Sequence, residues 1–156
     1  MYKNDPLTAG QALQKLRHYC GYQERCHQEV KEKLFQLGVR KEESGEIIAK
    51  LIEDGYLNEE RFAKLFAGGK FRQKKWGRIK IINELKKKGV SDYCIRKGMK
   101  EIDEDDYLET LRKLYKEKSK LLARETNPLQ KTRKIIEYLQ LKGFERGLIQ
   151  SIASKS

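Results

Sequence analysis

A glycine that recurs at a nearly constant interval is the feature that most constrains this fold. Gly38, Gly89 and Gly143 lie 51 and 54 residues apart. Each follows a leucine by four residues and precedes an apolar residue, in the segments KLFQLGV, ELKKKGV and YLQLKGF. A fixed period of this size indicates tandem structural repeats.

Helix start and stop signals surround each glycine. Thr8 with Gln11 predicts a capping box, Asn58 precedes two glutamates, and Asn127 precedes Pro128 at a first helical position. The repeated glycines suit helix C-termini, where the backbone turns left-handed. No alternating strand pattern is found. The sequence therefore predicts an all-α fold of three tandem three-helix modules, with boundaries at 1–57, 58–102 and 103–156.

Composition limits how much core each module can hold. The chain is 38% hydrophobic and 37% charged, so several thin cores are expected rather than one thick core. An example is the apolar stripe on one face of a predicted helix that is formed by Ile47, Ile48, Leu51 and Ile52. We expect packing between neighbouring modules to supply the remaining stability.

Positive charge is concentrated in the second module. Residues 70–100 hold twelve Lys or Arg against Glu84 and Asp92, which is +10 of the net charge of +12. A run of charge is commonly a solvated face, but this concentration favours a surface for a polyanion or an acidic protein. The candidate binding residues are Lys70, Arg72, Lys74, Lys75, Arg78, Lys80, Lys86, Lys87, Lys88, Arg96 and Lys97.

Three segments resemble a known family, the RecX regulators of bacterial RecA recombinase. LIEDGYLNEERFA (51–63) is similar to the family's junction between its first two modules, and WGRIKIINELKKKGV (76–90) to its second-module element. RCHQEVKEKLFQLGV (25–39) is similar to a first-module element, with Cys26 in place of the usual serine and Val30 in place of leucine.

The resemblance implies an elongated, curved array that binds RecA or RecA–DNA filaments and inhibits recombinase and ATPase activity in DNA repair and recombination. It implies no catalytic activity and no cofactor. A monomer is expected, with RecA as its partner and weak, non-specific binding to single- or double-stranded DNA.

The same segments predict where modules join. Aligning the glycines places Gly77 opposite Cys26, at the turn into the second helix of each module. Trp76 is then expected to close a corner of the core, with base stacking as the alternative. The predicted structural junction residues are Leu51, Gly55, Tyr56, Leu57, Phe62, Trp76, Gly77, Leu85 and Gly89.

Other chemistry has weaker support. His18, Cys20, Cys26 and His27 do not have the spacing of a zinc site, and the acidic run 101–109 suits a helix N-terminus better than a metal site. No Walker A loop, nucleophile elbow or dinucleotide fingerprint is present. The absence of a signal peptide and of a membrane-spanning run, with three cysteines, predicts a cytoplasmic protein that is not at a membrane.

A free-standing DNA-binding protein of helix-turn-helix type is the alternative function, because a three-helix module resembles that motif in outline. A DNA-binding protein of this type needs polar side chains that contact bases early in its recognition helix. SDYCIRKGMKEI and ERGLIQSIASKS offer few of them.

Overall fold

The structure, a computed structural model, describes residues 7–155 and contains only helices in that range. The helices are α1 (Ala9–Tyr22), α2 (His27–Gln36), α3 (Lys41–Glu53), α4 (Glu59–Lys74), α5 (Arg78–Lys87), α6 (Asp92–Met99), α7 (Glu104–Leu121), α8 (Pro128–Leu141) and α9 (Arg146–Lys155). None of these helices is both long enough and apolar enough to cross a bilayer.

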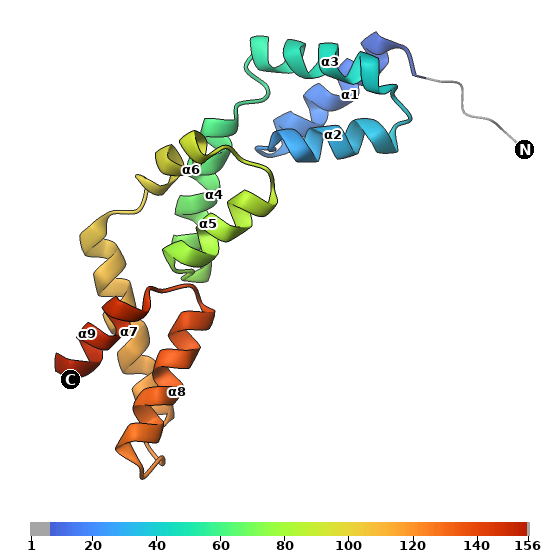
Figure 1. The fold of residues 1–156 in the computed structure, drawn as a ribbon. Helices are drawn as coiled ribbons and strands as arrows, with labels where there is room; N and C mark the ends of the chain where they lie inside the picture. The colour runs from blue at the N-terminus through green and yellow to red at the C-terminus, as the bar shows by residue number, and fades with distance from the viewer. Residues whose placement is uncertain (1–6, 156) are drawn as a thin grey trace, which may run out of the picture.

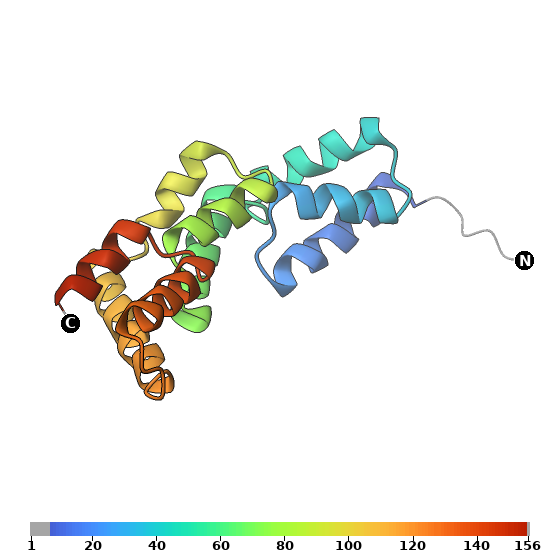
Figure 2. The same cartoon turned by 60° about the horizontal axis from the view of Figure 1, so that its bottom comes forward.

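The helices pack in consecutive groups of three. Helices α1–α3 contact one another, as do α4–α6 and α7–α9, and we call these groups modules 1, 2 and 3. The modules follow one another along an extended, curved row, with module 1 at one end and module 3 at the other (Figures 1 and 2). The predicted all-α array of tandem three-helix modules is confirmed.

Local capping signals act as the sequence predicts. Thr8 and Gln11 form a reciprocal capping box at α1. The Asn58 side chain accepts from the Arg61 backbone N–H at 2.9 Å, and Asn127 caps α8 with proline in its first turn. These bonds satisfy backbone donors that have no partner inside the helix.

The repeated glycines end the second helix of each module with one backbone geometry. Gly38, Gly89 and Gly143 have φ of 75°, 74° and 100°, which glycine adopts without steric cost. The next residue then donates its N–H to the carbonyl of the buried leucine four residues before the glycine, at 3.0–3.1 Å. The fifty-residue period is therefore a recurring helix stop.

The apolar core is divided unequally among the modules. Module 1 has its own cluster, which includes Ala12, Leu16 and Leu34. Modules 2 and 3 share one continuous cluster, which runs from Phe62 and Ala63 on α4 to Ile149 on α9. The expected packing between neighbours thus produces a common core only for modules 2 and 3.

The joint between modules 1 and 2 is mainly polar. Arg61 Nε lies 2.6 Å from a Glu24 carboxylate oxygen, and His27 Nδ1 lies 2.9 Å from Glu59. Cys26 is the module 1 residue that enters the shared core, and burial raises the pKa of its thiol to about 11.

Apolar residues expected at this joint belong instead to the separate cores. Leu51 and Leu57 are buried in module 1, whereas Phe62 is buried in the core of modules 2 and 3. Tyr56 is 38% exposed, and its ring lies 5.8 Å from the Arg17 guanidinium carbon. Within the described residues, the contacts across the joint include the Arg61–Glu24 and His27–Glu59 pairs and the buried side chain of Cys26.

The joint between modules 2 and 3 is a close backbone contact at Gly77. The Gly77 N–H donates to the Lys142 carbonyl at 2.7 Å, and the Ile79 N–H donates to the Gly143 carbonyl at 3.0 Å. A Cβ on Gly77 would lie 2.2 Å from the Gly143 carbonyl carbon, so only glycine fits this position.

Candidate polyanion interface

The candidate surface is built on the end of α4, the turn that follows it, α5 and the last turn of α6. Helix α4 ends at Lys74, and Lys75 takes a left-handed conformation with φ 57°. This turn changes the direction of the chain between α4 and α5, and the two helices pack together, so basic residues from both contribute to module 2. The Lys75 Nζ donates to the Arg72 carbonyl at 3.0 Å, which adds a bond across the strained turn.

Most of the predicted basic residues have no acidic partner. Among residues 7–155, only Arg78 and Lys87 of the eleven candidates lie within 4.0 Å of a carboxylate. The other nine define what we call the module 2 basic surface: Lys70, Arg72, Lys74, Lys75, Lys80, Lys86, Lys88, Arg96 and Lys97. Uncompensated charges at this density attract polyanions.

Two aromatic rings lie among these cations. Phe66 and Trp76 meet edge to face with centroids 6.4 Å apart, and both are half-buried against the shared core. Lys70 Nζ and Lys80 Nζ lie 5.1 and 4.5 Å from the Trp76 ring centroid. Such contacts are worth about 0.5–1 kcal/mol at exposed sites.

Lys70 and Lys88 also lie near Phe66, at 5.5 and 5.9 Å from its ring centroid. Trp76, which packs half-buried against the shared core, likewise contacts two ammonium groups, those of Lys70 and Lys80.

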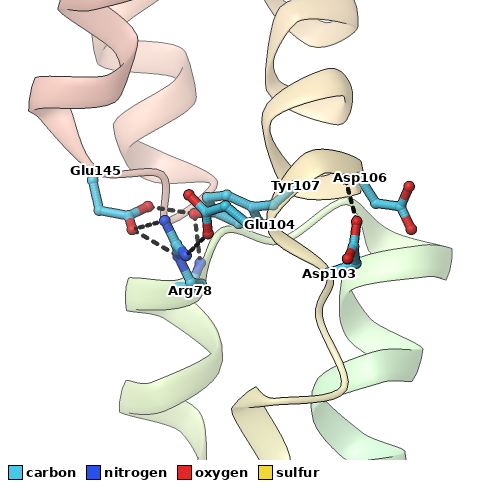
Figure 3. Close-up of polar contacts among 6 residues, drawn as sticks. All are labelled: Arg78, Asp103, Glu104, Asp106, Tyr107 and Glu145. Atoms are coloured by element: carbon cyan, nitrogen blue, oxygen red, sulfur yellow. Dashed lines mark hydrogen bonds and ion pairs between the residues drawn. The ribbon is translucent and has the colours of Figure 1, made fainter.

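Arg78 differs from its predicted role. Its guanidinium forms ion pairs with Glu104 and Glu145, each at 2.7 Å, and its side chain is 27% exposed. These acids lie at the beginning of α7 and just before α9, both in module 3 (Figure 3). The charge of Arg78 is thus neutralised within the molecule, and we assign it to the joint between modules 2 and 3.

Tyr107 completes this joint. Its hydroxyl donates to Glu145 and accepts the Arg78 backbone N–H at 2.9 Å, while the Arg78 guanidinium carbon lies 4.0 Å from the ring centroid. Burial, followed by the hydrogen bond to Glu145, raises the pKa of Tyr107 above its ordinary value. Figure 3 shows Tyr107 and Glu145 converging on Arg78 from two segments of module 3.

Lys142 is a basic residue beside this surface that sequence reasoning missed. Its Nζ donates to the Lys74 carbonyl at 3.2 Å, and burial together with the nearby charge of Lys80 lowers its pKa. A signal was available, since Lys142 precedes Gly143 as Lys88 precedes Gly89. Lys142 extends the basic region from module 2 into module 3.

The histidines and cysteines of module 1 serve other contacts. Cys20 and Cys26 are buried as free thiols, and His27 is paired with Glu59. No group of three or more His, Cys, Asp or Glu side chains suited to a metal occurs within residues 7–155.

Comparison with known proteins identifies relatives across most of the chain. Residues 58–99 match the family model described as the second three-helix domain of RecX. "Regulatory protein RecX" of Bacillus cytotoxicus is 32% identical over 132 residues, which are 85% of this chain and 48% of the relative. The chain thus spans about half the length of that relative.

A second relative is covered more fully. "Regulatory protein RecX" of Pelodictyon phaeoclathratiforme is 34% identical over 125 residues, which are 79% of this chain and 74% of the relative. The crystal structure of RecX from Lactobacillus salivarius is similar in fold, with a TM-score of 0.85 at 24% identity over 94% of this chain and 95% of that one. On the strength of the Pelodictyon match, the chain belongs to the RecX family.

Proposed function

We propose that this protein binds RecA filaments on DNA and inhibits their ATPase and recombinase activity without catalysing a reaction itself. The observation that best supports this proposal is the module 2 basic surface, where nine cationic side chains lack acidic partners within the described residues. The relatives' name, Regulatory protein RecX, supports a regulatory role. We expect the protein to act as a monomer in the cytoplasm.

The shape of the molecule supports binding along a filament. Modules 2 and 3 share one core and are held by the Arg78 ion pairs, so they form a firm platform for the basic residues. The extended, curved row of modules (Figure 2) offers a long surface, and the positive charge would meet DNA phosphates or acidic residues of the filament.

The alternative, a free-standing DNA-binding protein, has less support from helix chemistry. A recognition helix contacts bases through its N-terminal residues, but α6 begins with Asp92, Tyr93 and Cys94. A carboxylate at that position opposes the approach of phosphate. The basic residues of α6, Arg96 and Lys97, lie in its last turn.

The test is RecA ATP hydrolysis on single-stranded DNA, titrated with this protein at fixed RecA. The proposal expects hydrolysis to fall as protein is added, at concentrations where binding to DNA alone is small. Unchanged hydrolysis at severalfold excess over RecA, measured with a folded protein, would contradict it.

Binding to DNA alone separates the two functions. With about four or five phosphates neutralised, log affinity should fall against log salt with a slope of about −4, and equally for unrelated sequences. Fluorescence anisotropy with two labelled duplexes from 50 to 200 mM salt measures this. Tight, sequence-selective binding that barely depends on salt would favour the alternative.

A further inference from the structure

Module 1 carries a groove that the proposed function does not use. It has a volume of 730 Å³ and lies along α1, which packs beside α2 in Figures 1 and 2. Its lining comes from one face of α1, the loop that follows, and α2. The lining residues are Leu7, Gln11, Gln14, Lys15, His18, Tyr19, Tyr22, Arg25, Lys33 and Leu37.

The groove is positively charged. Among residues 7–155, none of the lining residues is acidic, and Lys15 and Lys33 have no carboxylate within 4.0 Å. Arg25 has one distant acidic neighbour, since its Nη1 lies 3.9 Å from Glu29. An anionic group entering the groove would therefore meet two uncompensated ammonium groups and a guanidinium.

The arrangement of Tyr19 disfavours a nucleobase as the occupant. The Arg25 guanidinium carbon lies 3.7 Å from the Tyr19 ring centroid, and Arg25 Nε donates to the Tyr19 carbonyl at 3.1 Å, which fixes the guanidinium in place. Lys33 Nζ lies 5.5 Å from the same centroid. Stacking of a base on Tyr19 would have to displace these cations.

The remaining lining favours apolar side chains. Leu7 and Leu37 are half-buried in the groove, and Tyr22 is 79% exposed. Apolar residues next to cations and the amides of Gln11 and Gln14 match a peptide that carries both carboxylates and an apolar anchor. Nucleic acid would use the cations but leave the exposed parts of Leu7 and Leu37 in contact with water.

We infer that this groove binds an acidic peptide segment of a partner protein, with apolar side chains of that segment seated against Leu7 and Leu37 at one end of the groove and against Tyr22 at the other. Its carboxylates would pair with Lys15, Lys33 and Arg25. The inference goes beyond the proposed function and does not depend on it, since the groove belongs to module 1 and the basic surface to module 2.

The test is an NMR titration of the full ¹⁵N-labelled chain at 150 mM salt. The probe is a synthetic peptide of about 14 residues, made of Asp, Glu, Leu and Phe at helical spacing, which spans about 21 Å as a helix. The expected result is saturable shifts of the amides that line the groove. Replacing Leu and Phe of the probe by Ser should weaken binding at least about fivefold, since the apolar anchor is lost.

Matched variants locate the site. Lys15→Glu with Lys33→Glu should weaken probe binding at least about tenfold, whereas Lys31→Glu with Lys41→Glu, the same charge change on exposed positions of module 1 outside the groove, should change it less than about twofold. Circular dichroism melting verifies that both variants are folded.

Three outcomes would overturn the inference. The first is that millimolar probe leaves the groove amides unshifted. The second is equal weakening by the two pairs of substitutions. The third is stronger shifts of the same amides by a thymidine oligonucleotide than by the peptide, which would assign the groove to nucleic acid.

Discussion

At the scale of single residues, the joint between modules 2 and 3 depends on the missing side chain of Gly77. The repeat alignment places Gly77 opposite Cys26, and both residues are helix N-caps in the structure. Cys26 fills its position with a buried side chain, but Gly77 has the backbone of Gly143 against it. Equivalent positions in the repeat therefore support two different joints.

Gly77→Ala should destabilise the protein by about 2–3 kcal/mol, because the new methyl group would overlap module 3 backbone and force the joint to shift. Gly69→Ala is the control. Gly69 is also a glycine of module 2, but it lies within α4, and a methyl group added to it would have no atom within 4 Å apart from its chain neighbours and the adjacent backbone of its own helix. Alanine there should therefore stabilise by about 0.5–1 kcal/mol. Urea unfolding measures both, and equal stability of the two variants would contradict the close contact.

The different roles of basic residues also originate at this scale. Arg78 and Lys80 belong to the same run of charge, but Arg78 meets acids 26 and 67 residues away in the chain. A single sequence shows the run and not its distant partners, so it did not show that Arg78 pairs with acids of module 3. Lys142 reaches the surface through the folding of module 3, and its position before Gly143, equivalent to Lys88 before Gly89, is the sequence signal for it.

At the scale of helices, the sequence was a reliable guide to where elements begin and end. Thr8, Asn58 and Asn127 cap helices as predicted, because capping bonds involve residues two or three positions apart. The joints between modules were less predictable, since they depend on long-range pairs. The polar joint of modules 1 and 2 and the Tyr107–Glu145–Arg78 contacts are both of this kind.

Tyr107→Phe tests the second of these joints at neutral pH. Removal of the hydroxyl deprives Glu145 of a donor and the Arg78 N–H of an acceptor, so unfolding free energy should fall by about 1–3 kcal/mol. Tyr93→Phe is the matched control, because Tyr93 is largely exposed and the loss of its hydroxyl should change stability by less than about 0.5 kcal/mol. A variant at position 107 that unfolds at the same urea concentration as the parent would contradict a structural role for the hydroxyl.

The stabilising effect of the Tyr107 hydroxyl should depend on pH. Because the pKa of Tyr107 is raised on folding, the unfolded chain releases its phenolic proton first as pH rises through about 10. The contribution of Tyr107 to the free energy of unfolding is therefore full below that pH. Above it, this contribution is lost with a slope of up to about 1.4 kcal/mol per pH unit. When urea unfolding is measured from pH 8 to 11, the free energies of unfolding of the parent and of Tyr107→Phe should converge as pH rises. A constant difference between them would contradict the burial of this phenol.

At the scale of the whole molecule, two cores divide the array into unequal parts. Module 1 has an apolar cluster of its own, whereas modules 2 and 3 are continuous. The sequence predicted three tandem three-helix modules, which is the correct architecture. It did not predict this division, because apolar stripes identify buried faces without showing which neighbour covers them.

Hydrogen exchange should report the two parts separately. Leu16→Ala and Ile81→Ala each remove a fully buried side chain, at a cost of about 2–5 kcal/mol. Leu16→Ala should lower protection within 9–57 only, whereas Ile81→Ala should lower it in both modules 2 and 3. Equal loss of protection along the whole chain in both variants would indicate a single cooperative unit.

The most direct test of the central claim is RecA ATPase inhibition by a charge-reversed protein. Arg72, Lys74 and Lys86 are exposed and have no acidic partner within residues 7–155, so changing all three to Glu should leave melting nearly unchanged. The control reverses Lys31, Lys41 and Lys113, which are exposed on modules 1 and 3. We predict that the first variant inhibits at least about tenfold more weakly than the parent and that the control inhibits normally. Normal inhibition by a folded first variant would show that the module 2 basic surface is only a solvated face.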